Sequence, residues 1–515
     1  MRAPAWVALL VLLGSAPVGA AEAVAAGDDG FAALEAQVVE HTLANGLELI
    51  LLPRRDVPVF SYATVANVGA VDEQVGNSGL AHMFEHMAFK GTSRVGTRDA
   101  EAERAALARV DERLTALRAA QRRGAPEAEI SRAREELRAA EEAASGLIEP
   151  NELDAILTRF GAVGLNASTS SDFTTYYYSL PSNKLEVWMS LESDRFLDPV
   201  LREFYQERDV VKEERFQRID SNPIGKLIEE FLGVAYLAHP YGRSGIGHVS
   251  DLDNLTRQEA IDFYRRYYVP GNLTVAVVGD LDPQATIAMA ERYFGRLPAG
   301  PLPEPVETVE PEQRAQRRVT LYLQAQPVAL IGFHKPAATH PDEPVYQALS
   351  AILSSGRTSR LYRSLIEEQR IAADAGGFGN FPGEKYPNTF IFYAFPTPGH
   401  GNDEVLAAMQ REIERLQREP VDAAELERVK AKARSEFVQE VASNQGLAVA
   451  LAQQQALSGD WRDLFDTLAR IDAVTAADVQ RVAKATFVPT NMTIGVIEPE
   501  PPAVAPAATE QGGSR

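Results

Sequence analysis

Apolar and polar positions near the start of the chain fall into short strand-like runs. Residues 41–52 alternate around the pair Asn45-Gly46, the strongest short signal for a β-hairpin, and residues 60–68 form a second β-rich run. Further strand-like runs lie at residues 163–170, 174–180 and 273–278. The last of these is uniformly apolar, which predicts a buried strand.

Patterns typical of helices lie between these runs. Residues 82–86 contain no Pro or Gly and consist mainly of residues that favour or tolerate a helix. Residues 99–145 are rich in Ala, Glu and Arg and are broken once, by Gly-Ala-Pro at 124–126. This pattern predicts a hairpin of two amphipathic helices, which is either a solvated surface insertion or a lid or partner contact. Other helical patterns cover residues 151–161, 184–196 and 203–219.

A proline-rich stretch divides the chain. Five prolines fall between residues 298 and 311, among Glu and Gly, and predict a linker at 298–316. Beyond it, strand-like runs at 319–333 and 389–395 alternate with helical patterns at 346–354, 360–369 and 403–416. Residues 22–36 are predicted to be a loose lead-in, and residues 500–515 a disordered tail.

Two segments recur at an offset of 219 residues. The sequence LDNLT at 252–256 matches IDAVT at 471–475, and VPGNLTVAV at 269–277 matches VPTNMTIGV at 488–496. A helix, a Val-Pro-x-Asn turn and a closing strand thus repeat without a gap. We therefore predict an α+β fold of two homologous domains, each an antiparallel-rich sheet packed with helices. Their predicted bounds are 37–297, including the helical insertion at about 99–147, and 317–499.

Composition narrows the class and the location of the protein. The formal net charge of −21 over 515 residues argues against a nucleic-acid partner. A charged start, a short apolar core and small residues near 20–21 predict a secretory signal peptide at 1–21, and hence a periplasmic or secreted protein. No other stretch is long and apolar enough to cross a membrane. Because the chain contains no Cys, any metal must be held by His, Asp or Glu.

The stretch His82-Met83-Phe84-Glu85-His86 carries the candidate chemistry. At 3.6 residues per turn, His82 and His86 share one helical face and could bind one metal ion, with Glu85 beside them as a base. A pair of His at this spacing is common by chance, but the added Glu gives His-x-x-Glu-His, the inverzincin signature. A third ligand is still needed. The remaining histidines are interpreted as structural or surface residues: His41, His239, His248, His334, His340 and His400.

Three stretches resemble the pitrilysin/insulinase family of zinc peptidases, in particular bacterial members similar to the mitochondrial processing peptidase. They are GLAHMFEHMAFKGT at 79–92, LNASTS at 165–170 and ERDVVKEE at 207–214. The resemblance implies Glu214 as the third zinc ligand and Glu207 as a supporting carboxylate. The spacing from His86 to Glu214 exceeds that of the family by about the length of the inserted hairpin.

The resemblance also implies the reaction and the shape of the molecule. With one Zn²⁺ per chain held by His82, His86 and Glu214, Glu85 would act as general base in peptide-bond hydrolysis. Each chain would form half of a clamshell chamber. Peptide or unfolded polypeptide would add as a strand to the edge at 165–169. The candidate contacts to the substrate backbone are Asn166, Ala167 and Ser168.

One departure from the family concerns the second half. Members that work alone or as homodimers often carry Arg and, seven residues later, Tyr, where this chain has Ile366 and Ala373. We therefore expect a heterodimer with a homologous subunit that lacks the metal motif, or otherwise a homodimer. The alternatives to a zinc endopeptidase are a non-catalytic assembly or scaffold subunit of the same fold, and a peptide-binding protein with structural zinc.

Overall fold

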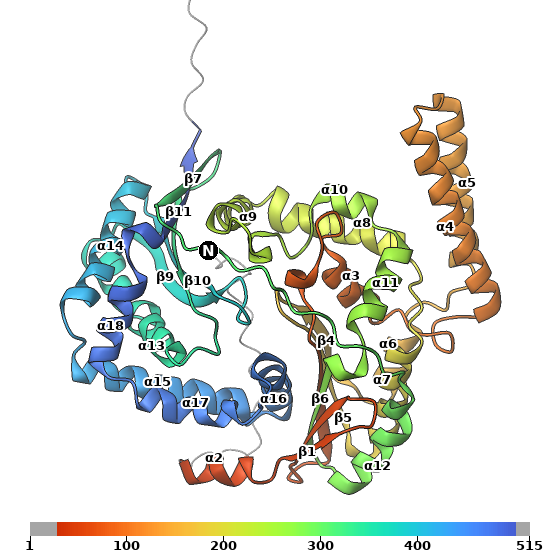
Figure 1. The fold of residues 1–515 in the computed structure, drawn as a ribbon, viewed down its shortest axis with the longest axis horizontal. Coiled ribbons are helices and arrows are strands. Elements are labelled where there is room, and N and C mark those ends of the chain that lie inside the picture. The colour runs from red at the N-terminus through yellow and green to blue at the C-terminus, as the bar shows by residue number, and fades with distance from the viewer. Residues whose placement is uncertain (1–27, 501–515) are drawn as a thin grey trace, which may run out of the picture.

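The computed structural model of this chain describes residues 28–500 and shows two halves side by side (Figure 1). The predicted signal peptide and all but the first residue of the predicted tail lie outside the described residues. The sheet of the first half has the strand order β1-β2-β6-β3-β5-β4, and that of the second half β7-β11-β8-β10-β9. Neighbouring strands are antiparallel except β2 with β6 and β7 with β11. The predicted α+β fold with antiparallel-rich sheets is confirmed.

The strands of the first sheet are β1 Val39–Thr42, β2 Glu48–Pro53, β3 Val59–Ala66, β4 Val163–Thr169, β5 Thr174–Pro181 and β6 Leu273–Gly279. Those of the second are β7 Arg317–Leu323, β8 Val328–Lys335, β9 Ala372–Phe381, β10 Asn388–Pro396 and β11 Met492–Pro499. The run predicted as strand-like at 319–333 is thus two strands, and β9 was not predicted. Its repeated glycines gave no strand signal.

The helices of the first half are α3 Leu80–Met87, α4 Ala100–Arg122, α5 Glu127–Ser145, α6 Glu152–Arg159, α7 Leu185–Leu197, α8 Phe204–Arg215, α9 Pro223–Ala235, α10 Val249–Asn254, α11 Arg257–Tyr267 and α12 Pro283–Tyr293. Those of the second are α13 Glu343–Ser354, α14 Asn402–Arg418, α15 Ala423–Ala442, α16 Asn444–Ser458, α17 Asp463–Asp472 and α18 Ala476–Thr486. None of the helices between residues 28 and 500 is long and apolar enough to span a bilayer.

The expected loose lead-in at 22–36 is wrong for its second part. Residues Asp28–Glu35 form helix α2. The Phe31 ring lies 5.1 Å from the Phe437 ring and is almost fully buried. Phe31, together with the partly buried Leu34, thus holds the segment against α15 and α17, although its Ala/Gly/Asp composition indicated no stable packing.

The repeat at an offset of 219 residues is visible in three dimensions. Helices α11 and α18 each begin with a capping box, formed by Thr256 with Glu259 and by Thr475 with Asp478. Each helix leads through a 3₁₀ turn into a strand inside its sheet, β6 or β11. Both closing strands run parallel to a neighbour, β2 or β7. The two halves therefore share one local architecture.

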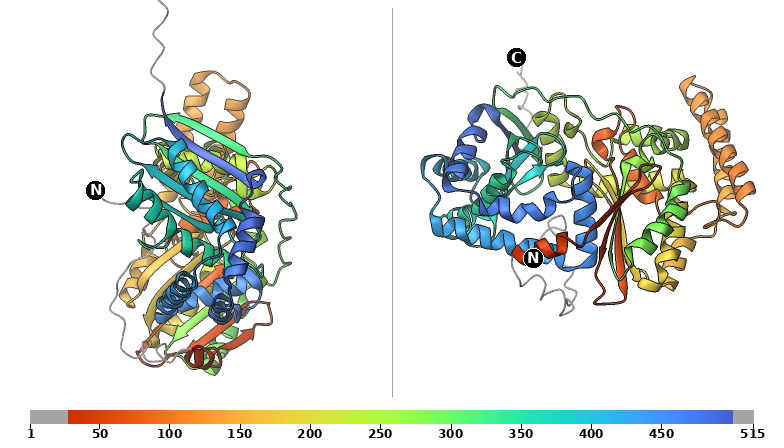
Figure 2. Two further views of the ribbon diagram at one scale, coloured as in Figure 1. Left: turned by 90° about the vertical axis from the view of Figure 1, so that its left-hand side faces the viewer. Right: turned by 60° about the horizontal axis from the view of Figure 1, so that its bottom comes forward.

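Each half also contributes a helix to the sheet of the other half. Helix α9 packs on β7 and β11 of the second sheet, and α16 packs on β3 and β6 of the first (Figure 1 and Figure 2). Phe231 of α9 is fully buried against Gly332 and Gly495, where an added Cβ would lie 2.5 and 3.1 Å from its ring. Leu447 and Leu451 of α16 belong to a buried cluster with side chains of the first sheet. The halves are therefore joined by two apolar interfaces as well as by the linker.

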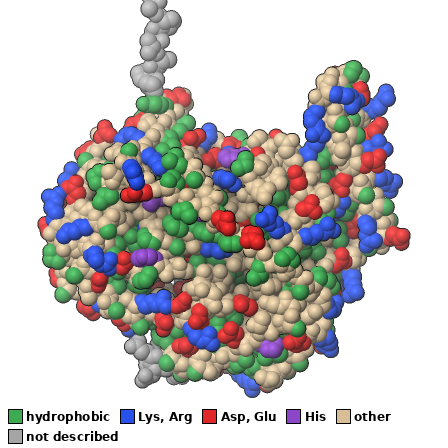
Figure 3. All heavy atoms as spheres, in the orientation of Figure 1, with side chains coloured by type: hydrophobic (Ala, Val, Ile, Leu, Met, Phe, Trp, Pro, Cys, Tyr) green, Lys and Arg blue, Asp and Glu red, His purple; other side chains and the backbone are tan. Residues whose placement is uncertain are grey.

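Helices α4 and α5 form the predicted hairpin, which projects from the side of the first half that faces away from the second half (Figure 1 and Figure 2). Leu107, Val110 and Leu114 of α4 are buried, whereas only Ala144 of α5 is. Acidic and basic side chains are interspersed over the face of the hairpin that Figure 3 shows. The hairpin is thus anchored along α4 and solvated elsewhere.

Candidate metal centre

Helix α3 is fixed at its first turn by a buried carboxylate. Glu73 accepts hydrogen bonds from the backbone N–H groups of Gly79 and Ala81, each at 2.8 Å. Gly79 has φ +94°, and an added Cβ would lie 2.8 Å from the Leu252 side chain, so glycine is required there. The apolar face of α3 is buried, with the Phe84 ring stacked 5.7 Å from Phe263. These contacts set the rotation of α3 and turn both of its histidines toward α8.

Three side chains converge between α3 and α8. Glu214 Oε2 lies 3.2 Å from His86 Nε2 and 3.5 Å from His82 Nε2. One potential ligand atom from each residue lies within 4.8 Å of the others, and among residues 28–500 no other group of His, Asp and Glu is arranged in this way. The structure therefore brings together the three ligands that the family resemblance implies.

The surroundings suit a divalent cation with nitrogen and oxygen ligands. Burial lowers the pKa of His82 to about 4, so that this imidazole is neutral, and its Nδ1 is buried without a hydrogen-bond partner. Hydrogen bonds to Glu207 and Glu214 raise the pKa of His86 to about 9. A bound cation would replace the proton between His86 and Glu214. Two imidazoles and one carboxylate match the ligand set of catalytic zinc sites, so the residues present fit zinc.

Glu85 lies beside this cluster without supplying one of its ligand atoms. It is half-buried, and burial raises its pKa. A carboxyl group with a raised pKa is a stronger base than an ordinary carboxylate, which suits proton transfer at this position.

Glu207 supports the cluster from α8. Its Oε2 lies 3.4 Å from Nδ1 of His86, on the opposite side of the imidazole from Glu214. Its other oxygen accepts a hydrogen bond from Lys90, whose Nζ also donates to Glu203 Oε2 at 3.0 Å. Burial opposes the charge of Lys90, but these two carboxylates raise its pKa overall. The sequence analysis missed Lys90 and Glu203, although Lys90 lies within the stretch that resembles the family.

Strand β4 forms the free edge of the first sheet and packs near α3. Of the candidate substrate contacts, Asn166 is exposed and its amide donates to the Tyr177 hydroxyl at 3.2 Å. Ala167 is buried and Ser168 is half-buried. Among residues 28–500, the strand therefore has an unpaired edge close to the helix that carries the candidate ligands His82 and His86.

Up to residue 500, where the described structure ends, the second half offers no counterpart of this cluster. Ile366 is half-buried against the core of the second half, and Ala373 is exposed on β9, the edge strand of the second sheet. By the repeat offset, Glu207 and Glu214 correspond to Leu426 and Ala433 of α15. Within residues 28–500 the six other histidines also stay outside any such group.

Sequence models of one protein family match both halves of the chain. A sequence model described as "Insulinase (Peptidase family M16)" matches residues 52–109 and 145–247, and one described as "Peptidase M16 inactive domain" matches residues 254–433. The gap in the first match coincides with most of the helical hairpin.

Similar proteins include zinc protease PqqE of Helicobacter pylori, 29% identical over 472 residues, which are 89% of this chain and 92% of that protein. An uncharacterized zinc protease of Mycobacterium leprae is 25% identical over 88% of this chain and 90% of its own length. Among solved structures, a protease from Helicobacter pylori covers 90% of this chain and 99% of its own, with TM-score 0.75 and 27% identity. The periplasmic protease PqqL from Escherichia coli shares the fold, with TM-score 0.65 and 17% identity over 90% of this chain and 47% of its own.

Proposed function

This chain belongs to the insulinase family of peptidases (M16), and on that basis we propose that it is a zinc-dependent endopeptidase with one Zn²⁺ per chain. Its substrates are peptides or unfolded polypeptides. The observation that carries the proposal is the convergence of His82, His86 and Glu214 with Glu85 beside them. The names of the similar zinc proteases support the choice of metal and of reaction.

The side chains have separate roles in hydrolysis. His82, His86 and Glu214 would hold the metal, as in catalytic zinc sites with three protein ligands. Bound zinc would supply a Lewis acid that lowers the pKa of a water molecule and polarises a peptide carbonyl. Glu85 takes a proton from the attacking water and delivers it to the leaving amine. Glu207 orients the His86 ring by holding its Nδ1.

Substrate binds in extended form along β4. Asn166, Ala167 and Ser168 present the unpaired edge of the first sheet, so their backbone groups can pair with a peptide strand while the scissile bond reaches α3. The chamber that encloses the peptide is a clamshell completed by a second subunit.

At the positions where family members that work alone often carry Arg and Tyr, this chain has Ile366 and Ala373, which offer neither a charge nor a hydroxyl to the substrate. Their absence supports a heterodimer in which a partner without the metal motif supplies Arg and Tyr. The signal peptide predicted from the sequence supports a location in the periplasm or outside the cell. The chain purified alone is then expected to be weakly active, and a motif-less homologous subunit should restore activity. Full activity of the homogeneous chain would refute the heterodimer.

A non-catalytic scaffold subunit is disfavoured because such a subunit has no need to keep three ligands and an adjacent carboxylate. The test is Glu85→Gln, with metal content and cleavage of an unstructured peptide measured on the same samples. We expect zinc to be retained and kcat to fall by about 10² to 10⁴-fold. Unchanged hydrolysis would refute Glu85 as the base, and absence of zinc and of hydrolysis in the wild type, with the homologous subunit present, would refute the enzyme.

A further inference from the structure

We propose that Lys90 is a positioning residue for the metal centre and that the base of the helical hairpin, at the first turn of α4, holds it in place through Glu103 and Arg202. The inference rests on the proposed zinc site, but it concerns residues outside the ligand set. If the inference holds, the hairpin of α4 and α5 helps to position the metal centre, although most of its surface is exposed to solvent.

Lys90 limits the positions open to Glu207. The ammonium group bridges Glu203 at the start of α8 and Glu207 one turn later. With one oxygen of Glu207 held by Lys90, the other is directed at Nδ1 of His86, 3.4 Å away. A carboxylate on the far nitrogen fixes the rotation of a ligating imidazole, and such supports are worth about 10- to 100-fold in metal affinity. Lys90 thus acts on the metal through Glu207 and His86.

Arg202 in turn fixes the backbone that carries Lys90. Its side chain is 1% exposed and donates to the carbonyl oxygens of Lys90, Thr92 and Val95, at 2.7 Å for Thr92 and 2.9 Å for Val95. The turn that follows Lys90, at residues 91–96, wraps closely around this guanidinium. A Cβ at Gly91 or Gly96 would lie within 2.9 Å of Nη1 of Arg202, so both positions need the small size of glycine.

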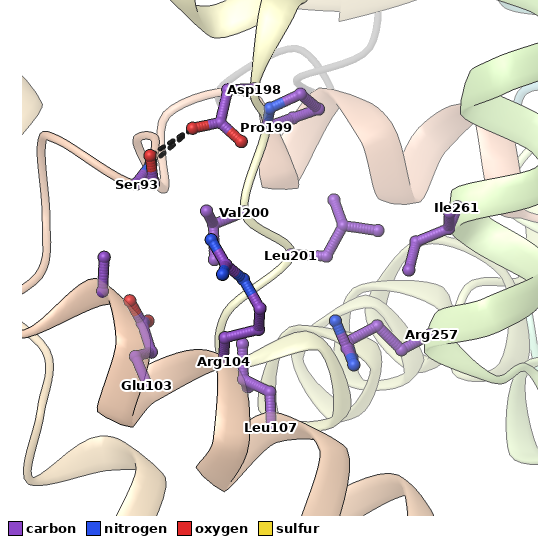
Figure 4. A pocket seen from close by; sticks show the side chains of 11 residues that line it. Ser93, Glu103, Arg104, Leu107, Asp198, Pro199, Val200, Leu201, Arg257 and Ile261 are labelled. Carbon is purple, nitrogen blue, oxygen red and sulfur yellow. Dashed lines mark hydrogen bonds between the residues drawn. The ribbon is translucent and has the colours of Figure 1, made fainter.

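The hairpin supplies the counter-charge for Arg202. Glu103, in the first turn of α4, is 2% exposed and accepts hydrogen bonds from Nε of Arg202 at 2.8 Å and from Nη2 at 3.2 Å. The Glu103 carboxylate thus neutralises the buried guanidinium. Removing either member of such a pair would leave the other as an uncompensated buried charge. A cavity of about 160 Å³ adjoins the contact, lined by Glu103, Arg104 and Leu107 of α4 and by residues 198–201 (Figure 4). Glu103 therefore connects the base of α4, at residues that the family model still matches, to the turn that carries Lys90.

The first test replaces Lys90 by Met, with Lys90→Arg as the conservative variant. The zinc dissociation constant, measured by competition with a chelator, is expected to rise about 10-fold or more in Lys90→Met, while Lys90→Arg stays within about threefold of the wild type. The thermal midpoints should remain similar, and the visible spectrum of the cobalt-substituted protein should change in Lys90→Met only. Zinc binding by Lys90→Met as tight as by the wild type overturns the role of Lys90. A wild type that binds no zinc overturns the metal site itself.

The second test addresses the hairpin with two matched substitutions. Glu103→Gln keeps the shape of the side chain but removes the charge that Arg202 requires. Glu136→Gln breaks the exposed ion pair with Arg113 on the same hairpin, 3.0 Å apart. We expect Glu103→Gln to weaken zinc binding several-fold and Glu136→Gln to leave it unchanged. Equal zinc affinities in both variants, even with a lowered thermal midpoint in Glu103→Gln, overturn the coupling of the hairpin to the metal centre.

Discussion

Arg218 donates to Oε1 of Glu214 at 2.7 Å, while Oε2 of the same carboxylate faces both histidines. The two oxygens therefore have separate partners. Arg218 lies one turn beyond Glu214, in the short π-helical segment Phe216–Asp220 that follows α8, and its side chain is mostly exposed. This pairing orients Glu214 to offer a single oxygen to a metal.

Replacing Glu214 by Gln should remove the metal without unfolding the chain. The amide loses the negative charge and most of the affinity for zinc, and Arg218 loses its counter-charge at an exposed position. We expect zinc content to fall from about one per chain to a small fraction. The matched control is Glu213→Gln, on the same helix but exposed and outside the cluster. Equal zinc contents in the two variants would contradict the assignment of Glu214.

Much of the fold was predictable because its signals are local. The hairpin around Asn45-Gly46, the helix that carries His82 and His86, and the Gly-Ala-Pro break between α4 and α5 all follow from residues close in sequence. The matching repeats predicted two related halves. They could not predict the exchange of α9 and α16 between the sheets, because the apolar faces of these helices do not identify the sheet that they cover.

The metal centre was predictable only in part. The spacing of His82, Glu85 and His86 within one helix is a local signal, whereas Glu214 lies 128 residues after His86 and was inferred from the family resemblance. Lys90 and Glu73 were missed for a different reason. Their roles depend on which carboxylates and amides meet them in space, and a single Lys or Glu in a charged sequence carries no such information.

Proline substitutions along β4 test it as the substrate edge. In an antiparallel pair, the N–H groups of successive residues point alternately toward the partner strand and away from it. One of Asn166 and Ala167 has its backbone N–H directed away from β5, and proline at that position should raise KM with little loss of stability. Proline at the other position removes a hydrogen bond to β5 and should destabilise the sheet. Zinc content should remain unchanged for the outward position. If neither substitution affects KM, peptide does not pair with this edge.

The carboxyl of Glu73 predicts a dependence of stability on pH. Its side chain is almost fully buried, and burial raises its pKa from 4.5 to about 8 although two amides donate to it. The folded chain thus binds this proton more tightly than the unfolded chain does. The resulting stability is fully present below about pH 4.5 and is lost as the pH rises through about 8.

We therefore expect the free energy of unfolding of the wild type to fall relative to Glu73→Gln between pH 4.5 and pH 8. The difference is at most roughly 5 kcal/mol, since one pKa unit corresponds to about 1.4 kcal/mol. Urea titrations of both proteins at several pH values measure it. Parallel pH profiles would show that folding does not raise the pKa of Glu73.

The exchange of helices predicts that the two halves unfold together. Phe231 of α9 lies in the first half of the chain but is fully buried on the second sheet, against Gly332 and Gly495. Unfolding of the first half would therefore strip α9 from the second sheet, and unfolding of the second half would strip α16 from the first. Each sheet would then expose an apolar face, so neither half is expected to remain folded alone.

Phe231→Ala tests this coupling. Loss of the ring should cost about 3–5 kcal/mol through lost burial and the cavity left behind, and it should lower one shared thermal transition. Phe390→Ala is the control, since Phe390 is equally buried but lies within the core of the second half. Both variants should shift a single calorimetric peak, because in each case the destabilised half removes a helix from its neighbour. Two resolved peaks, with Phe231→Ala moving only one of them, would show that the interfaces are too weak to couple the halves.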